Sequence, residues 1–156
     1  MFKRRTQMKR IGIIGVGLLG SAVASRLLKG GFLVTAYDSR PEQVKALQAQ
    51  GLIAAASIAD AAAETDAVFT ILPSLESVET TILGAGGLIE TAPQNCTLIQ
   101  MSTISPNLTR RLGNAAAARA LAFLDAPMSG TSAMVERGDC AIFVGGERSR
   151  AKACQP

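Results

Sequence analysis

Residues 11–20, with the sequence IGIIGVGLLG, decide how the rest of this 156-residue chain is interpreted. Their apolar start is typical of a parallel strand that is buried on both faces. Gly15, Gly17 and Gly20 then have the G-x-G-x-x-G spacing of a strand-to-helix turn that holds a pyrophosphate. The first glycine allows the tight turn, the second lets phosphates approach the backbone, and the third lets helix and strand pack closely. The alternative is a glycine-rich turn without a ligand, so residues further along must decide.

Apolar runs and helical segments alternate along the whole chain. A helix is predicted over residues 21–29, and further strands are predicted at 33–37, 67–72, 97–101, 121–124 and 141–144. Such alternation predicts an α/β fold of Rossmann type, with a doubly wound, mostly parallel sheet and right-handed crossovers. The length accommodates about one domain. We expect this dinucleotide-binding domain to span residues 10–156, after a basic N-terminal tail at residues 1–9.

Asp38 directly follows the second predicted strand, 18 residues after Gly20. A dinucleotide-binding fold has an acidic residue near this place, and that residue binds the adenosine ribose. The alternative is a helix cap, but Ser39 can serve as the cap, with Pro41 in the first helical turn. A carboxylate here repels a 2′-phosphate and therefore favours NAD. The guanidinium of Arg40 could reach such a phosphate, which keeps NADP open.

Composition narrows the function classes. Much of the formal net charge of +4 comes from the N-terminal tail, which we interpret as a solvated terminus rather than a surface for nucleic acid or membrane. No apolar stretch is long enough to span a bilayer and the first ten residues do not resemble a signal peptide, so we expect a cytoplasmic protein. The three cysteines are widely spaced and indicate neither a metal site nor a disulfide framework. The chain has no histidine, so acid–base chemistry needs another residue type.

Three more motifs follow later strands, where open α/β sheets bind their ligands. They are Leu72-Pro73-Ser74, Ser102-Thr103-Ile-Ser-Pro106 and Asp125-Ala-Pro-Met-Ser-Gly130. The turn at Ser129 and Gly130 offers a hydroxyl and exposed amides, which suits an anion. The alternative for each motif is an ordinary turn, with Ser74 as a helix cap in the first.

In this order, the four motifs resemble the nucleotide-binding domain of the β-hydroxyacid dehydrogenase family, over about residues 9–146. The family includes 3-hydroxyisobutyrate and tartronate-semialdehyde reductases, and 6-phosphogluconate dehydrogenase is a relative. The resemblance implies an NAD(P)-dependent oxidoreductase that moves hydride between a nicotinamide cofactor and a small 3-hydroxy acid or semialdehyde acid. It also implies a carboxylate-bearing substrate and a homo-oligomer as partners.

The resemblance implies roles for individual residues as well. The pyrophosphate would lie on the glycine turn, the adenosine ribose at Asp38, and the nicotinamide ribose near the second and third motifs. The predicted cofactor-binding residues are Gly15, Val16, Gly17, Leu18, Leu19, Gly20, Asp38, Ser39, Arg40, Leu72, Pro73 and Thr103. The substrate carboxylate would bind at Ser129, Gly130 and Thr131.

Two features depart from the family pattern. Thr131 stands where the family commonly has a second glycine, and Met134 and Val135 replace small residues, so no member's substrate is carried over. The family lysine that acts as general acid belongs to a second, all-helical domain and is expected beyond residue 156, because Lys152 does not match its motif. We therefore expect a truncated cofactor-binding domain with no catalytic residue of its own. The alternatives are an imine reductase and a non-catalytic dinucleotide-binding or interaction module.

Overall fold

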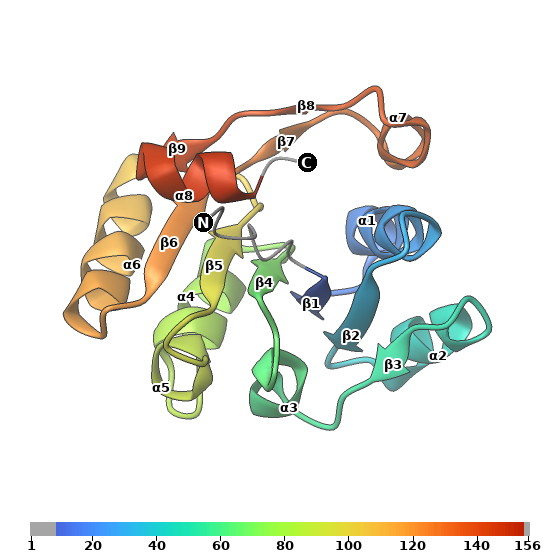
Figure 1. Ribbon diagram of the computed structural model, residues 1–156, viewed down its shortest axis with the longest axis horizontal. Helices are drawn as coiled ribbons and strands as arrows, with labels where there is room; N and C mark the ends of the chain where they lie inside the picture. The colour runs from blue at the N-terminus through green and yellow to red at the C-terminus, as the bar shows by residue number, and fades with distance from the viewer. Residues whose placement is uncertain (1–8, 155–156) are drawn as a thin grey trace, which may run out of the picture.

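The computed structural model describes residues 9–154, in which a twisted seven-stranded sheet lies between two layers of helices (Figure 1). The sheet has the strand order β3-β2-β1-β4-β5-β6-β9. Its strands are β1 (Arg10–Ile14), β2 (Leu33–Tyr37), β3 (Ile53–Ala54), β4 (Ala67–Thr70), β5 (Thr97–Gln100), β6 (Ala122–Asp125) and β9 (Gly145–Gly146). The first six pair in parallel and β9 pairs antiparallel with β6. The predicted Rossmann-like sheet is confirmed.

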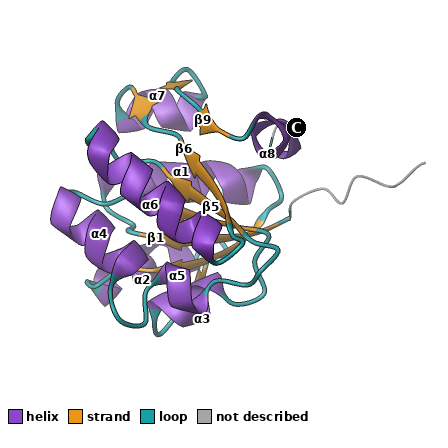
Figure 2. Ribbon diagram, turned by 90° about the vertical axis from the view of Figure 1, so that its left-hand side faces the viewer, coloured by secondary structure: helices purple, strands orange, loops and turns teal. Residues whose placement is uncertain are grey.

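Helices connect the strands and cover both faces. They are α1 (Leu18–Lys29), α2 (Pro41–Gln48), α3 (Ile58–Ala62), α4 (Leu75–Leu83), α5 (Leu88–Thr91), α6 (Pro106–Ala118), α7 (Ser132–Arg137) and α8 (Arg148–Ala153). The helices α7 and α3 lie on opposite sides of the sheet (Figure 2). Of the basic tail predicted at residues 1–9, only Lys9 falls within the described residues, and its backbone N–H donates to Asp66 Oδ2 at 2.8 Å.

Successive side chains of each strand point to opposite faces of the sheet, and each face carries its own apolar core. Ile13 packs with residues of α1, α2 and α7, whereas its neighbour Ile14 packs with residues of α3, α4 and α6. Both side chains are buried. The apolar run at the start of the chain is therefore buried on both faces, as expected for a central parallel strand.

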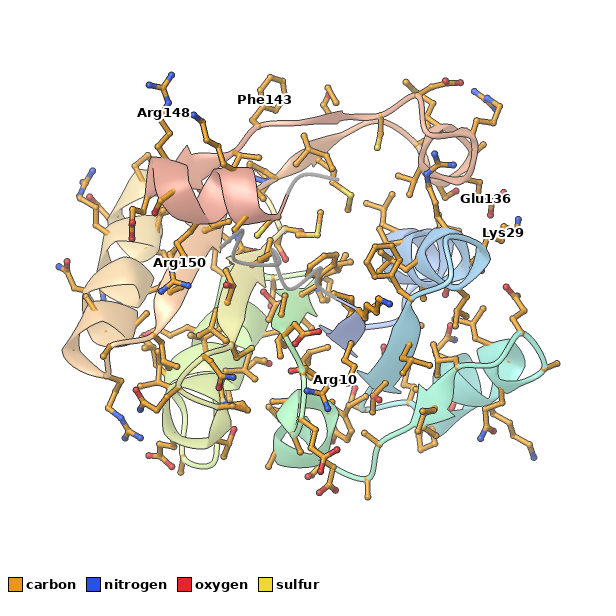
Figure 3. All side chains as sticks on the ribbon, viewed as in Figure 1. Arg10, Lys29, Glu136, Phe143, Arg148 and Arg150 are labelled. Carbon is orange, nitrogen blue, oxygen red and sulfur yellow. The ribbon has the colours of Figure 1, made fainter. Side chains whose placement is uncertain are left out.

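The region after β6 differs from the prediction. A strand was expected over 141–144, but only Ala141–Ile142 forms one (β8), and it pairs antiparallel with β7 (Met128–Ser129) in a separate two-stranded sheet. Phe143 is 63% exposed and points away from the body of the protein (Figure 3). The two glycines expected to end the strand instead form β9 on the edge of the main sheet. Apolar character at 141–144 indicated a buried strand, yet the antiparallel return to β6 leaves these side chains in solvent.

Candidate functional site

The glycine turn lies between β1 and α1, where the strand order reverses. Gly15 has a φ of +95°, and a Cβ there would collide with the carbonyl oxygen of Ile71. A Cβ at Gly20 would collide with the carbonyl oxygen of Gly15. Both glycines are therefore required by the protein's own packing.

Gly17 has no such requirement. Its φ of −68° and ψ of −162° are open to other residues, and among described atoms a Cβ would meet only an Arg40 guanidinium nitrogen, at 3.9 Å. The space above Gly17 is open. Neither backbone strain nor internal packing therefore requires glycine at position 17, which leaves its backbone open to close approach by another group.

The helix α1 begins at Leu18, three residues before the predicted start, so Leu18, Leu19 and Gly20 form its first turn. Its N-cap is Gly17, which provides no side-chain acceptor, and no acidic side chain lies in the first turn. The first N–H groups of a helix lack intrahelical acceptors, and the helix dipole adds positive potential there. The turn therefore offers amide donors to an anion such as a pyrophosphate.

Asp38 connects the end of β2 to this turn. Its Oδ2 accepts from the N–H of Val16 at 2.8 Å, and its Oδ1 accepts from the N–H of Arg40 at 2.9 Å. The Asp38 side chain is 7% exposed and the Arg40 side chain 60% exposed, with the guanidinium Nε 3.6 Å from Oδ1. The N-cap of α2 is Arg40 and not Ser39, so the prediction that Ser39 serves as the cap is wrong. The Asp38 carboxylate instead binds the backbone N–H of Val16 in the glycine turn and the backbone N–H of Arg40 at the start of α2.

Leu72 and Pro73 lie in the loop after β4, the neighbour of β1 in the sheet, and Thr103 lies in the loop after β5, one strand further along. The side chain of Leu72 packs against Gly15, since a Cβ on that glycine would lie 2.9 Å from Leu72 Cδ2. Pro73 and Thr103 are exposed. Ser74 caps α4 in a capping box with Ser77, as the alternative for that motif predicted. The structure thus brings these loops to the same edge as the glycine turn.

Polar side chains form a network at this edge, and its central residue, Gln100, was not among the residues predicted from the sequence. Gln100 is 1% exposed and Ser102 is 9% exposed. The Gln100 side chain forms hydrogen bonds with the backbone of Ser102 and with Asp125, and the Ser102 hydroxyl accepts from the N–H of Leu72. The signal for Gln100 in the sequence is a glutamine that directly follows the apolar residues of β5. Sequence spacing could not reveal its partner Asp125, because cross-strand register decides that pairing.

The turn at Ser129, Gly130 and Thr131 leads from β7 into α7 and is exposed. Thr131 is the N-cap of α7, where its Oγ1 accepts from the N–H of Met134 at 3.3 Å. The short helix rests on α1, because Val135 is buried in the core that α1 shares. Val135 is therefore a packing residue.

Other site types find no support within residues 9–154. No group of three or more His, Cys, Asp or Glu side chains is placed to hold a metal ion. No helix in this range combines the length and apolar character that crossing a bilayer requires.

Burial raises the pKa of the Cys96 thiol to about 11, against a weaker opposing effect of its hydrogen bond with Thr65.

Comparison with known proteins agrees with this geometry. The uncharacterized oxidoreductase YkwC of Bacillus subtilis is 36% identical over 148 residues, which are 95% of this chain and 51% of that protein. The 3-hydroxyisobutyrate dehydrogenase of Pseudomonas aeruginosa is 36% identical over 139 residues, covering 89% of this chain and 47% of that protein. The structure of Mycobacterium tuberculosis 3-hydroxyisobutyrate dehydrogenase matches with a TM-score of 0.87 at 29% identity, over 96% of this chain and 50% of that one.

The chain thus spans about half the length of the relatives it matches. Residues 10–156 also match the model of one domain family, which covers the glycine turn and every strand-end motif described above. The chain belongs to the family of the NAD-binding domain of 6-phosphogluconate dehydrogenase.

Proposed function

We propose that this chain is the cofactor-binding part of an NAD(P)-dependent oxidoreductase that transfers hydride to or from a small hydroxy acid. The observation that carries the proposal is Gly17, whose glycine identity nothing in the described protein requires. A pyrophosphate on the first-turn amides of α1 supplies the missing reason, because a phosphate must approach the backbone closely there.

The strand order supports a separate place for each half of the dinucleotide. Asp38 and Arg40 stand at the end of β2 and would receive the adenosine ribose. The other half would then extend over β1 towards the loops after β4 and β5, where Leu72, Pro73 and Thr103 lie. When bound, the nicotinamide supplies or accepts the hydride, and the chain's residues orient it.

The substrate would bind beside the nicotinamide, with its carboxylate at Ser129, Gly130 and Thr131. All three residues are exposed, and a turn with a serine hydroxyl suits an anion, which supports that role. Relatives of this chain are dehydrogenases of small hydroxy acids, and 3-hydroxyisobutyrate dehydrogenase is one of them. We propose a 3-hydroxy acid or semialdehyde acid as the substrate class.

The proton donor is proposed to come from outside the described residues. Lys29 ends α1 at the edge of the sheet opposite the glycine turn and points away from the body (Figure 3). Lys9 precedes β1 and lies at that same opposite edge. The chain alone is expected to bind cofactor and to turn over slowly, because loss of a positioned general acid costs roughly 10²- to 10⁴-fold.

The test of cofactor binding compares two glycine-to-alanine variants by NADH fluorescence titration. Gly17→Ala should weaken NADH binding roughly tenfold or more, because the new Cβ occupies the place of the phosphate. Its free energy of unfolding should stay within about 1 kcal/mol of the wild type. Gly113→Ala is the matched control, since its Cβ would also fit, 3.6 Å from Phe123 and away from the site. Equal NADH affinity of wild type and Gly17→Ala would contradict the proposal.

A further inference from the structure

A buried side-chain network joins the carboxyl ends of two neighbouring strands. Gln100, the last residue of β5, donates from Nε2 to Asp125 Oδ1 at 2.9 Å and to the carbonyl oxygen of Ser102 at 2.7 Å. Its Oε1 accepts from the N–H of Ser102 at 2.5 Å. Asp125 ends β6, and its Oδ2 accepts from Thr109 Oγ1 of α6 at 3.3 Å. One glutamine side chain therefore holds both backbone groups of Ser102 and ties them to β6.

The network extends to a third strand end. Ser102 Oγ accepts from the N–H of Leu72 at 2.8 Å, in the loop that follows β4. The Leu72 side chain in turn packs against Gly15 in the glycine turn. The positions of the two loops that carry Leu72-Pro73 and Thr103 thus depend on a chain of contacts that starts at Gln100.

Packing alone does not call for an amide at this place. Leu98 and Phe123, which lie on the same face of the sheet one pleat earlier, pack in the apolar core with α6. A leucine would fill the Gln100 position at similar volume, whereas a buried amide beside a half-buried carboxylate is costly unless every partner is in place. Satisfied buried networks make local structure rigid and unique. The cost therefore indicates a need for fixed loop geometry.

We infer that Gln100 is a positioning residue for the nicotinamide half of the cofactor. The inference rests on the proposed function. Gln100 is 1% exposed and cannot reach a ligand, so it acts through Ser102 and Leu72. The adenosine half would bind at the end of β2, on the other side of β1, which no hydrogen bond of this network reaches (Figure 1). Loss of Gln100 should therefore affect the two halves differently.

The test measures binding of NADH and of ADP, which lacks the nicotinamide and its ribose, to the wild type and to Gln100→Leu. We expect NADH to bind about tenfold more weakly to the variant, because Ser102 and Leu72 lose fixed positions, while ADP affinity changes less than twofold. Ser102→Ala, which removes only the acceptor of the Leu72 N–H, should shift NADH affinity in the same direction by less. Thr109→Val is the matched control, because it breaks a bond to Asp125 and leaves the Gln100–Ser102–Leu72 contacts in place.

The outcomes separate the inference from the proposed function. Wild-type protein that binds neither NADH nor ADP would overturn the proposed function itself. If the wild type binds both, equal losses of NADH and ADP affinity in Gln100→Leu would show a general structural role and overturn the inference. Unchanged NADH affinity in both Gln100→Leu and Ser102→Ala would overturn it as well. Should Gln100→Leu fail to fold, Ser102→Ala against Thr109→Val decides by the same NADH-to-ADP comparison.

Discussion

Asp38 serves the fold and the candidate site with one carboxylate. It accepts from the N–H groups of Val16 and Arg40, so it fixes the glycine turn relative to the end of β2. Removing the carboxylate would leave the Val16 N–H without its partner. The glycine turn would then become less well ordered, both with NADH and with NADPH. A change at Asp38 therefore cannot isolate cofactor preference, and Arg40 offers the cleaner position.

Arg40 should decide how well the chain tolerates a 2′-phosphate. Its exposed guanidinium lies beside Gly17 and next to Asp38. We expect the wild type to bind NADH more tightly than NADPH, because the Asp38 carboxylate repels the phosphate. Arg40→Gln should weaken NADPH roughly fivefold further and change NADH less than twofold, since a charge-assisted bond to phosphate is lost. Fluorescence titration of both cofactors measures this, with the remote Arg119→Gln as the control. Equal losses for the two cofactors would contradict the role.

The sequence predicts the site residues that act through type and spacing, and misses those that act through pairing. The glycine spacing and Asp38 were identifiable because each has a defined distance along the chain. Gln100 and Asp125 are 25 residues apart and meet only because β5 and β6 pair in one register. No local pattern encodes that register before the whole sheet is assembled.

The C-terminal end of α6 has a strained backbone position that a substitution can relieve. Ala120 has a φ of +54°, and its N–H donates to the carbonyl oxygen of Ala117 at 3.0 Å. The N–H of the buried Leu121 donates to the carbonyl oxygen of Ala116 at 2.9 Å. This pair of bonds is the Schellman arrangement, in which the left-handed position favours glycine.

Ala120→Gly should therefore stabilise the protein by about 1 kcal/mol, because glycine adopts positive φ without the penalty of a Cβ. The matched control is Ala117→Gly, an exposed position inside the same helix, which should destabilise by about the same amount. Urea unfolding followed by circular dichroism measures both free energies. A loss of stability in Ala120→Gly similar to that in the control would refute the assignment of strain.

Element prediction succeeded where caps and periodicity agree. Ser105 caps α6 with Pro106 at its first position, and Leu108, Leu112 and Ala116 form its buried face. The strand at 33–37 was also confirmed. The short elements α7, β3, β7 and β9 were missed or misassigned, since two to six residues carry too little periodicity. The antiparallel edge strand β9 consists of glycines alone, and its pairing with β6 places it.

At the scale of the whole molecule, the core under α3 to α6 contains a titratable group that links stability to pH. Cys96 is 1% exposed and precedes β5, and burial raises the pKa of its thiol from 9.0 to about 11. Well below pH 9 the thiol is neutral in both folded and unfolded chains. Between pH 9 and 11 the unfolded chain ionises while the folded one stays neutral, so stability falls as the pH rises.

The free energy of unfolding should therefore drop by about 2 kcal/mol between pH 8 and 10.5 through this one thiol. The measured quantity is the difference in slope between the wild type and Cys96→Ala, because the two proteins share every other ionisable group. The variant begins less stable, because a buried sulfur is removed, but should lose less stability with pH. Urea unfolding at pH 8, 9, 10 and 10.5 gives both curves. Parallel curves for the two proteins would mean that Cys96 ionises as readily in the folded core as in the unfolded chain. That result would contradict the raised pKa of this thiol.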